Sequence, residues 1–503
     1  MVGRGVPPDA TYLFKHALMQ DASYRTLLRS RRRDLHERIV RVLESHYPAV
    51  IEQQPELVAH HCSQADLIGK AIVYWELAGR TSSARSANTE AAAQSRKGLD
   101  LLSTLPEGRE RWQQELRLQS ILGAALAASQ GNAAPATGRS YARARELCEK
   151  LGETTALIPV LSGLSTHYQT RAEYPAMREV AADLLRRGDE QGDTASSVVG
   201  HRSMGICLHQ LGDFTAARDH FEHVLRLYSP DDHHALVSIA GYDMRAVALS
   251  YLGWDLLILG QPDQAQALGD QALSWSRQLR HPHTIAFTLI YAALLKLLRR
   301  DHGSADKRLR ELTSFAAEHR FPVWLALARI MHGYVLGVRG DTDQGLAIAR
   351  QGYTERTATG SRWNETFYLA LLAETCARSG HVDEALELLA AALAAVDETG
   401  EQWFAAELHR MRGEWLAKGG QGEEAEASFQ RAIAIARRQH ARMWELQAAA
   451  SLARLLGDRG QPDEARDLLA PVLATFSEGF DVPALVDAKS LLDRFHPCGL
   501  RTA

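Results

Sequence analysis

The chain of 503 residues has few cysteines, no long apolar run and no apolar segment at its start. Its five cysteines are scattered and never form a CxxC pair, which excludes a disulfide framework and a cysteine-based zinc cluster. No run approaches the roughly 18 consecutive apolar residues of a membrane-spanning helix. Met1 to Ala10 lacks the apolar core of a signal peptide. We therefore expect a soluble, cytoplasmic protein.

The sequence also lacks an excess of charge and the usual catalytic motifs. Its 57 Lys and Arg against 61 Asp and Glu give a net charge of −4, which does not indicate nucleic-acid binding. The Gly69-Lys70 pair is followed by Ala71, so it is no phosphate-binding loop. GxSxG and HExxH are absent, and the histidine pairs have no partners at a metal-binding spacing. We expect no enzymatic activity, no cofactor and no metal.

What the sequence does contain is a turn signature that returns at a nearly constant interval. A period of about 40 residues is typical of stacked supersecondary units rather than of a globule around one core. A degraded copy stands at Arg300-Asp-His-Gly-Ser-Ala305. The regular copies are Gly260-Gln-Pro-Asp-Gln-Ala265, Gly340-Asp-Thr-Asp-Gln-Gly345, Gly380-His-Val-Asp-Glu-Ala385, Gly420-Gln-Gly-Glu-Glu-Ala425 and Gly460-Gln-Pro-Asp-Glu-Ala465.

Each signature joins two apolar helical patterns. Around Gly380, an apolar stripe precedes the glycine, which suits a helix C-terminus with positive φ, and Asp383 and Glu384 then suit the start of a new helix. We count about nine such hairpins between residues 110 and 480 and one more between Ala71 and Leu102. The pattern resembles tetratricopeptide repeats with a longer period. It predicts an all-α solenoid that forms a right-handed superhelix, without β-strands.

The first 50 residues differ from the repeats and are predicted to form a separate helical segment, followed by the repeat superhelix over residues 51–503. Residues 12–22 form a short amphipathic pattern. Residues 27–43 predict a helix with Leu35, Ile39, Val42 and Leu43 on one face, stopped at Tyr47-Pro48. A helix over residues 482–495, with Val486, Leu491 and Leu492 on its apolar side, is expected to cap the array.

Several segments resemble a known family. Residues 14–44, FKHALMQDASYRTLLRSRRRDLHERIVRVLE, are similar to the closing winged-helix segment of STAND-type signalling ATPases, in which an NTPase module precedes tetratricopeptide repeats. Segments such as ELVAHHCSQADLIGKAIVYWELAGR and SYLGWDLLILGQPDQA resemble the C-terminal halves of bacterial proteins that add an adenylate/guanylate cyclase or DNA-binding domain. The resemblance implies a regulatory repeat arm, cut from a longer chain or encoded separately. Without a phosphate-binding loop, the family's ATP chemistry does not transfer.

One column of the repeats is a candidate binding groove. Trp324, Trp363, Trp403 and Trp444 recur at almost the same interval as the turns, and His283 occupies the same column one repeat earlier. An aromatic row on the concave face would suit a peptide, helix or small ligand. Its polar rim would be Glu365, Tyr368, Glu407, His409 and Arg410. The alternative is that the rings pack between neighbouring repeats.

Two hypotheses of function follow. In the first, the chain is a non-catalytic protein-interaction and sensor scaffold that acts on an attached or associated NTPase or cyclase module. In the second, it is a regulator whose superhelix interior binds a small-molecule inducer. The basic cluster Arg29, Arg31, Arg32 and Arg33 has acidic neighbours and no interleaved aromatics, so we interpret it as a solvated helix face or a contact to another domain.

Overall fold

The structure, a computed structural model, describes residues 2–4, 11–13, 22, 24–233, 236–237 and 241–495. The predicted all-α class is confirmed, because the described residues are mostly helical. A short antiparallel pair, β1 (Val2–Arg4) and β2 (Thr11–Leu13), was not predicted. Three-residue strands carry too little alternation to be found by periodicity. Most of the amphipathic segment predicted over residues 12–22 lies outside the described residues.

The contacts divide the chain into two compact units, Met1–Gly131 with Pro135–Thr154, and Asn132–Ala134 with Thr155–Ala503. The domain boundary predicted at residue 50 is not visible in this division. The first unit contains α2 (Arg29–His46), α3 (Pro48–Gln53), α4 (Pro55–Gln64), α5 (Ile68–Ala84), α6 (Asn88–Leu102), α7 (Arg109–Gln130) and α8 (Pro135–Leu151).

Helix α2 buries only part of the predicted face. His36 and Val40 are buried, whereas Ile39 is 38% and Val42 48% exposed. Val40 packs with Val58 of α4 in one core, which places α2 in the same unit as the first repeats. Of the predicted face, Leu43 packs against this core, whereas Ile39 and Val42 are exposed because His36 and Val40 meet α4.

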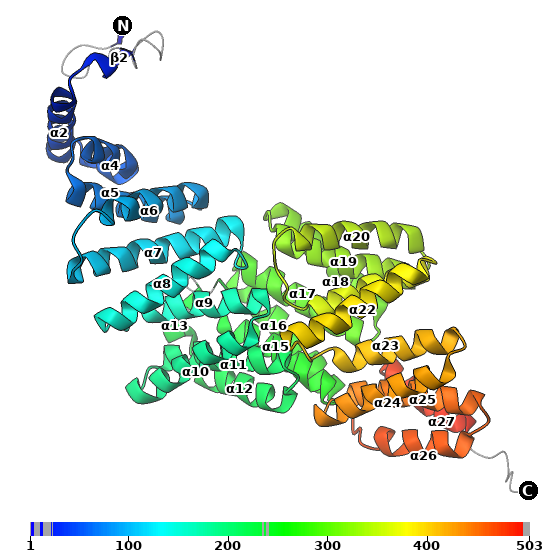
Figure 1. Cartoon of the computed structure of the whole chain (residues 1–503). Helices are drawn as coiled ribbons and strands as arrows, with labels where there is room; N and C mark the ends of the chain where they lie inside the picture. Colours follow the sequence, from blue (N-terminus) through cyan, green and yellow to red (C-terminus); the bar gives the residue numbers. More distant parts are fainter. Residues whose placement is uncertain are drawn as a thin grey trace, which may run out of the picture. The chain divides into compact units, whose positions relative to one another are not determined.

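The second unit continues the helical pairs in chain order (Figure 1). Within the described residues, nine pairs lie between Arg109 and Leu473 and α5 with α6 forms another, as the turn signature predicted. The helices of the second unit are α9 (Leu157–Arg171), α10 (Tyr174–Gln191), α11 (Thr194–Gln210), α12 (Phe214–Leu227), α13 (Pro230–His233), α15 (Met244–Ile258), α16 (Pro262–Leu279), α17 (Pro282–Leu298), α18 (His302–Glu318), α19 (Pro322–Val338), α20 (Thr342–Thr357), α21 (Glu365–Arg378), α22 (Val382–Thr399), α23 (Ala405–Lys418), α24 (Gly422–Arg438), α25 (Arg442–Asp458), α26 (Pro462–Leu473) and α27 (Pro483–Arg494).

The predicted glycine turns have the expected geometry. Gly380 has φ +83°, and the next amide, His381 N, donates to Cys376 O at 2.9 Å, as in a Schellman motif. At the degraded copy, Arg300 keeps the same turn with φ +59°, and Asp301 N donates to Lys296 O at 2.9 Å. The turn therefore persists where the glycine does not.

Loops of the second unit also bond to the ends of helices far back in the sequence. Arg362 N donates to Thr170 O and Gln402 N donates to Gln210 O, both at 2.7 Å, so that each bond spans several repeats. Further along, Gly479 N donates to the Asp263 carboxylate at 2.9 Å. These bonds close the coil of repeats onto itself.

The C-terminal helix α27 lies against the last repeat, as the predicted cap would. It buries Leu485, Ala488 and Leu491, whereas Val486 of the predicted face is 45% exposed.

Close backbone approach in the pair α19 and α20 generates a first prediction. A Cβ at Gly345 would lie 2.5 Å from Gly333 O and 2.8 Å from Gly337 N. Alanine ordinarily favours a helix over glycine, but here it would force the two backbones apart. We expect Gly345→Ala to destabilise the protein by about 2 kcal/mol. In contrast, Gly303→Ala in α18, where nothing lies within 4 Å, should be neutral or stabilise by up to about 1 kcal/mol. Urea denaturation of both variants checks this, and equal midpoints would contradict it.

A histidine cluster in the first unit generates a second prediction, on pH. His36 Nδ1 and His61 Nδ1 lie 2.7 Å apart, and the His60 ring lies 5.6 Å from that of His61. Burial, and then the neighbouring His36 and His60, lower the pKa of His61 to about 4. In the unfolded chain His61 has a pKa near 6.5. Between pH 6.5 and 4 it therefore binds a proton in the unfolded chain but not in the folded one.

The free energy of unfolding is therefore not reduced by His61 above pH 6.5, and it falls as the pH is lowered towards 4. We expect the urea midpoint of the wild type to fall between pH 7 and pH 4.5. His61→Gln keeps a polar side chain without this titration and should flatten part of the slope. Parallel pH profiles of the two proteins would show that His61 does not contribute.

Candidate functional site

The predicted tryptophan row lies in a filled interior. Trp403 is fully buried, Trp444 is 1% and Trp324 6% exposed, while Trp363 is half-buried. The Trp403 ring lies 4.5 Å from that of Trp254 on α15, a helix several repeats earlier in the chain. An exposed groove along all four rings requires accessible faces, which three of them lack. The closed coil is the physical reason, because it presses the inner helices against one another.

Three of the predicted rim residues, and His283 of the predicted column, are dispersed. Tyr368 is fully buried in α21. His283 stacks on Tyr242 with ring centroids 4.7 Å apart, and burial lowers its pKa to about 4. Burial likewise lowers the pKa of His409 to about 4.

The fourth, Glu365, is held by its own neighbours. It accepts from Tyr353 Oη at 2.7 Å and from Arg356 Nη1 at 2.9 Å. It lines an open depression of about 430 Å³ beside α20 and α22. Glu365 therefore does not join the other rim residues.

Three predicted residues do come together. Trp444, Glu407 and Arg410 line a cavity of about 320 Å³ among the inner helices α17, α19, α21, α23 and α25. Most of its lining is buried, and its apolar wall includes Phe367, Phe404 and Met411. Its other polar lining residues are Arg300, His302, Tyr334, Glu374, Arg378, Glu414 and Gln447.

The carboxylates of the cavity are paired with arginines. Arg410 Nε donates to both Glu407 oxygens at 3.0 Å, and Arg410 Nη1 donates to Glu414 at 2.6 Å. Burial alone would raise the pKa of Glu414, but Arg410 and Ser451 outweigh it and hold the pKa below its usual value. Glu374 lies 2.7 Å from Arg378. Glu407, Glu414 and Glu374 are thus charge-compensated.

Arg300 is the least compensated cation of the cavity. It donates to the neutral Gln447 Oε1 at 2.8 Å, and its nearest carboxylate, Asp487 at 3.6 Å, is about half exposed. Burial and the charge of Arg410 lower the pKa of Arg300. Beside it, His302 Nδ1 is enclosed without a hydrogen-bond partner. Arg300 can therefore donate a hydrogen bond to an acceptor group of a ligand in the cavity.

Sequence reasoning missed Arg300 and treated it only as a degraded turn. The sequence signal was that Arg300 stands where the other turns have glycine, at a position that requires a positive φ. A non-glycine residue there is strained by an amount on the order of 1 kcal/mol. The chain keeps this strain and gains a cation inside the coil.

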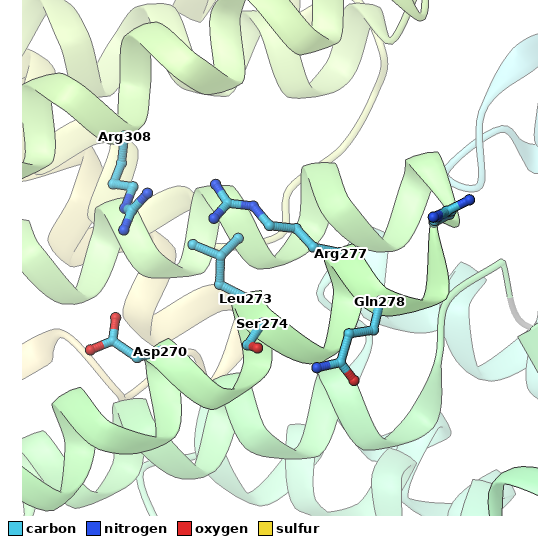
Figure 2. Close-up of a pocket in the computed structure, with 7 residues that line it drawn as sticks. Asp270, Leu273, Ser274, Arg277, Gln278 and Arg308 are labelled. Atoms are coloured by element: carbon cyan, nitrogen blue, oxygen red, sulfur yellow. The ribbon is translucent and has the colours of Figure 1, made fainter.

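Two further features do not form an enclosed site. An open depression of about 630 Å³ lies beside the outer helices α16 and α18, and Figure 2 shows Arg277 and Arg308 among the residues that line it. It is open to solvent, and both arginines form ion pairs with Glu311. The predicted basic cluster on α2 is mostly exposed, with Arg32 over the ring of Tyr24 and Arg33 3.2 Å from Asp66.

No group of three or more metal-ligating side chains that could hold an ion occurs among the described residues. Cys62, Cys148, Cys207 and Cys376 are buried, and Cys498 lies outside the described residues. In the described part of the chain, none of the helices combines the length and apolar character that a membrane crossing needs.

Comparison with known proteins identifies the repeats. A tetratricopeptide-repeat profile matches residues 404–478, and a second matches residues 198–223, 246–268, 326–351 and 367–396. Together with the helical pairs, these matches show that the chain contains tetratricopeptide repeats.

Two individual proteins are similar to the chain. The uncharacterized protein R02095 of Rhizobium meliloti (strain 1021) is 24% identical over 442 residues, which cover 87% of this chain and 42% of the relative. The chain thus spans less than half the length of that relative. The crystal structure of a Rap protein complexed with Competence and Sporulation Factor has a TM-score of 0.52 at 11% identity, covering 73% of this chain and 98% of the Rap chain. This likeness shows a shared fold alone.

The burial of Trp403 generates a third prediction. Replacement by alanine would leave a large void where the ring meets Trp254, Phe367 and Phe404. We expect Trp403→Ala to destabilise the protein by about 3–5 kcal/mol. Trp112→Ala, at a half-buried ring beside Lys150, should have a clearly smaller effect. A Trp403→Ala protein as stable as the wild type would show that the ring is not needed for packing.

Proposed function

We propose that this chain is a non-catalytic sensor scaffold that binds a small ligand inside its repeat superhelix. The observation that carries the proposal is the cavity of about 320 Å³ beside Arg300, most of whose lining residues are buried. That volume lies near the lower end of the range of small-molecule pockets, about 300–1,000 Å³. It is too small for a helix with its side chains, whose diameter is about 10 Å. The cavity therefore favours a small inducer over a protein partner in the concave face.

The cavity also supports a way to transmit binding. Arg300 lies in the turn between α17 and α18, while its partner Gln447 lies on α25, 147 residues further along. A ligand that takes over the Arg300 hydrogen bond contacts several repeats at once. If it binds one curvature of the repeats better than another, it shifts the population towards that curvature.

We further propose that the scaffold is the regulatory arm of a STAND-type ATPase signalling system, linked to a cyclase or to transcription. The resemblance of residues 14–44 to the end of a winged helix supports this, as does a relative that extends well beyond the matched region. Leu28, just ahead of α2, is 76% exposed, and Ile39 and Val42 on α2 are exposed as well, which offers apolar side chains to an attached module. The link itself rests on analogy.

An immunoblot of the native host lysate, with an antibody raised to this chain, tests the link. A band well above the mass of this chain supports an arm joined to further modules. A band at its own mass would contradict an attached module and leave a free-standing scaffold, whose partner would be another protein.

The ligand proposal generates a fourth prediction. Calorimetric titration with a metabolite panel, in the absence of any protein partner, should find a small molecule that binds. Arg300→Gly restores the turn glycine and should keep the fold while it weakens this binding about tenfold to a hundredfold, the loss of a hydrogen bond to a charged group.

Arg320→Gly is the matched control. Arg320 also has positive φ, +56°, but it is exposed and lies outside the cavity lining. Relief of strain is common to both variants, so only Arg300→Gly should alter binding. Equal ligand affinity of both variants, or a chain that binds proteins only, would overturn the cavity as the sensor site.

A further inference from the structure

Arg202 on α11 is a buried cation without a counter-ion. The residue is 3% exposed, and its Nε and Nη1 atoms are enclosed without any hydrogen-bond acceptor. No salt bridge to Arg202 occurs among the described residues. A charge in this state strongly destabilises a folded chain, because it has left water and gained no partner.

The other buried arginines of the described structure are fully compensated. Arg356, 2% exposed, donates to Glu365 at 2.9 Å and to Trp363 O at 2.8 Å. Arg410, 9% exposed, is bonded to Glu407 and Glu414. Arg202 thus differs from the other buried arginines, because it has no carboxylate partner. An anionic ligand would supply one.

Three tyrosines act electrostatically on the guanidinium. They are Tyr242, ahead of α15, Tyr251 on α15 and Tyr291 on α17, and the last two rings lie 4.9 Å apart. Burial raises the pKa of Tyr242 to about 12, so its phenol is neutral at physiological pH and provides no negative charge. Burial raises the pKa values of Tyr251 and Tyr291 as well. The environment of Arg202 is therefore aromatic and uncharged.

We infer that Arg202 is the anion-recognition residue of a second interior site, which takes a small organic anion. Its carboxylate or phosphate group accepts hydrogen bonds from the guanidinium, and its apolar body lies against the tyrosine rings. An oxyanion supplies the missing charge and the missing acceptors at once. Aromatic walls favour a compact apolar or ring-shaped body over a bare inorganic ion. None of the four residues lines the cavity around Arg300, so this inference does not depend on the function proposed above.

The fifth prediction asks whether Arg202 binds a ligand or stabilises the fold. The two roles predict opposite changes in the urea midpoint when the residue is replaced. Arg202→Met removes the unpaired charge and keeps an apolar chain of similar length. We expect it to raise the urea midpoint of the free protein. Arg356→Met is the matched control and should lower the midpoint, because it leaves the Glu365 carboxylate without its arginine.

The second arm adds probes at constant ionic strength. Benzoate and phenyl phosphate should raise the midpoints of the wild type and of Arg356→Met but leave that of Arg202→Met unchanged. Benzyl alcohol tests the ring without the charge, and inorganic phosphate tests the charge without the ring. A shift with benzoate alone assigns the site to carboxylates, and a shift with phenyl phosphate alone assigns it to phosphates.

The inference is overturned by any of three results. Arg202→Met lowers the midpoint as Arg356→Met does, which would make Arg202 structural. The anions stabilise all three proteins alike, which would place their effect elsewhere. Neither benzoate nor phenyl phosphate shifts the wild type, which would exclude the proposed ligand class.

Discussion

Backbone hydrogen bonds between segments that lie several repeats apart determine how much open space remains inside this solenoid. Where Gln402 N meets Gln210 O and Arg362 N meets Thr170 O, one stretch of the coil rests on another. An amide and a carbonyl that are buried together must pair, so these contacts hold the coil closed. A closed coil has no open concave face, and its inner helices must fill the space that remains. Helix α15 accordingly buries almost every residue from Met244 to Ile258.

The side chains of the interior are aromatic and largely apolar, so a polar group among them needs a partner or points to a ligand. Most are satisfied in place: Gln210 donates to the Asn364 side chain at 2.8 Å, and His209 lies 2.6 Å from Asp255. Arg410 and Arg356 each bind a carboxylate. Arg202 has no carboxylate partner, and Arg300 has only the half-exposed Asp487 at 3.6 Å, although burial lowers the pKa of both arginines. Selection for packing alone would replace such residues with apolar ones of the same size.

The repeat architecture could be predicted from the sequence because its determinants are local. A glycine that closes one helix and acidic residues that open the next lie close together in the chain, and the structure has helical pairs at these places. Faces of single helices were less predictable. In α2 the stripe through Ile39 and Val42 is exposed, because the neighbouring stripe of His36 and Val40 meets α4. Which stripe is buried depends on a partner, and the helix alone does not contain that information.

The tryptophan row shows the same limit on a larger scale. The regular spacing places Trp363, Trp403 and Trp444 at equivalent positions of their repeats, but it does not say whether that position faces solvent or another turn of the coil. The answer lies in contacts between segments that are several repeats apart, and no local pattern encodes them.

Departures from the repeat carry the information that the repeat itself cannot. Positions that return in every repeat serve stacking, which every repeat needs, so they describe the solenoid and not its ligand. Arg300 stands where the regular turns have glycine, and it retains a strained φ of +59°. A local rule is broken there, and the side chain that breaks it lines the cavity of about 320 Å³ among the inner helices. In an array built from near-copies, the residue that differs from its equivalents at a physical disadvantage is therefore the first place to look for function.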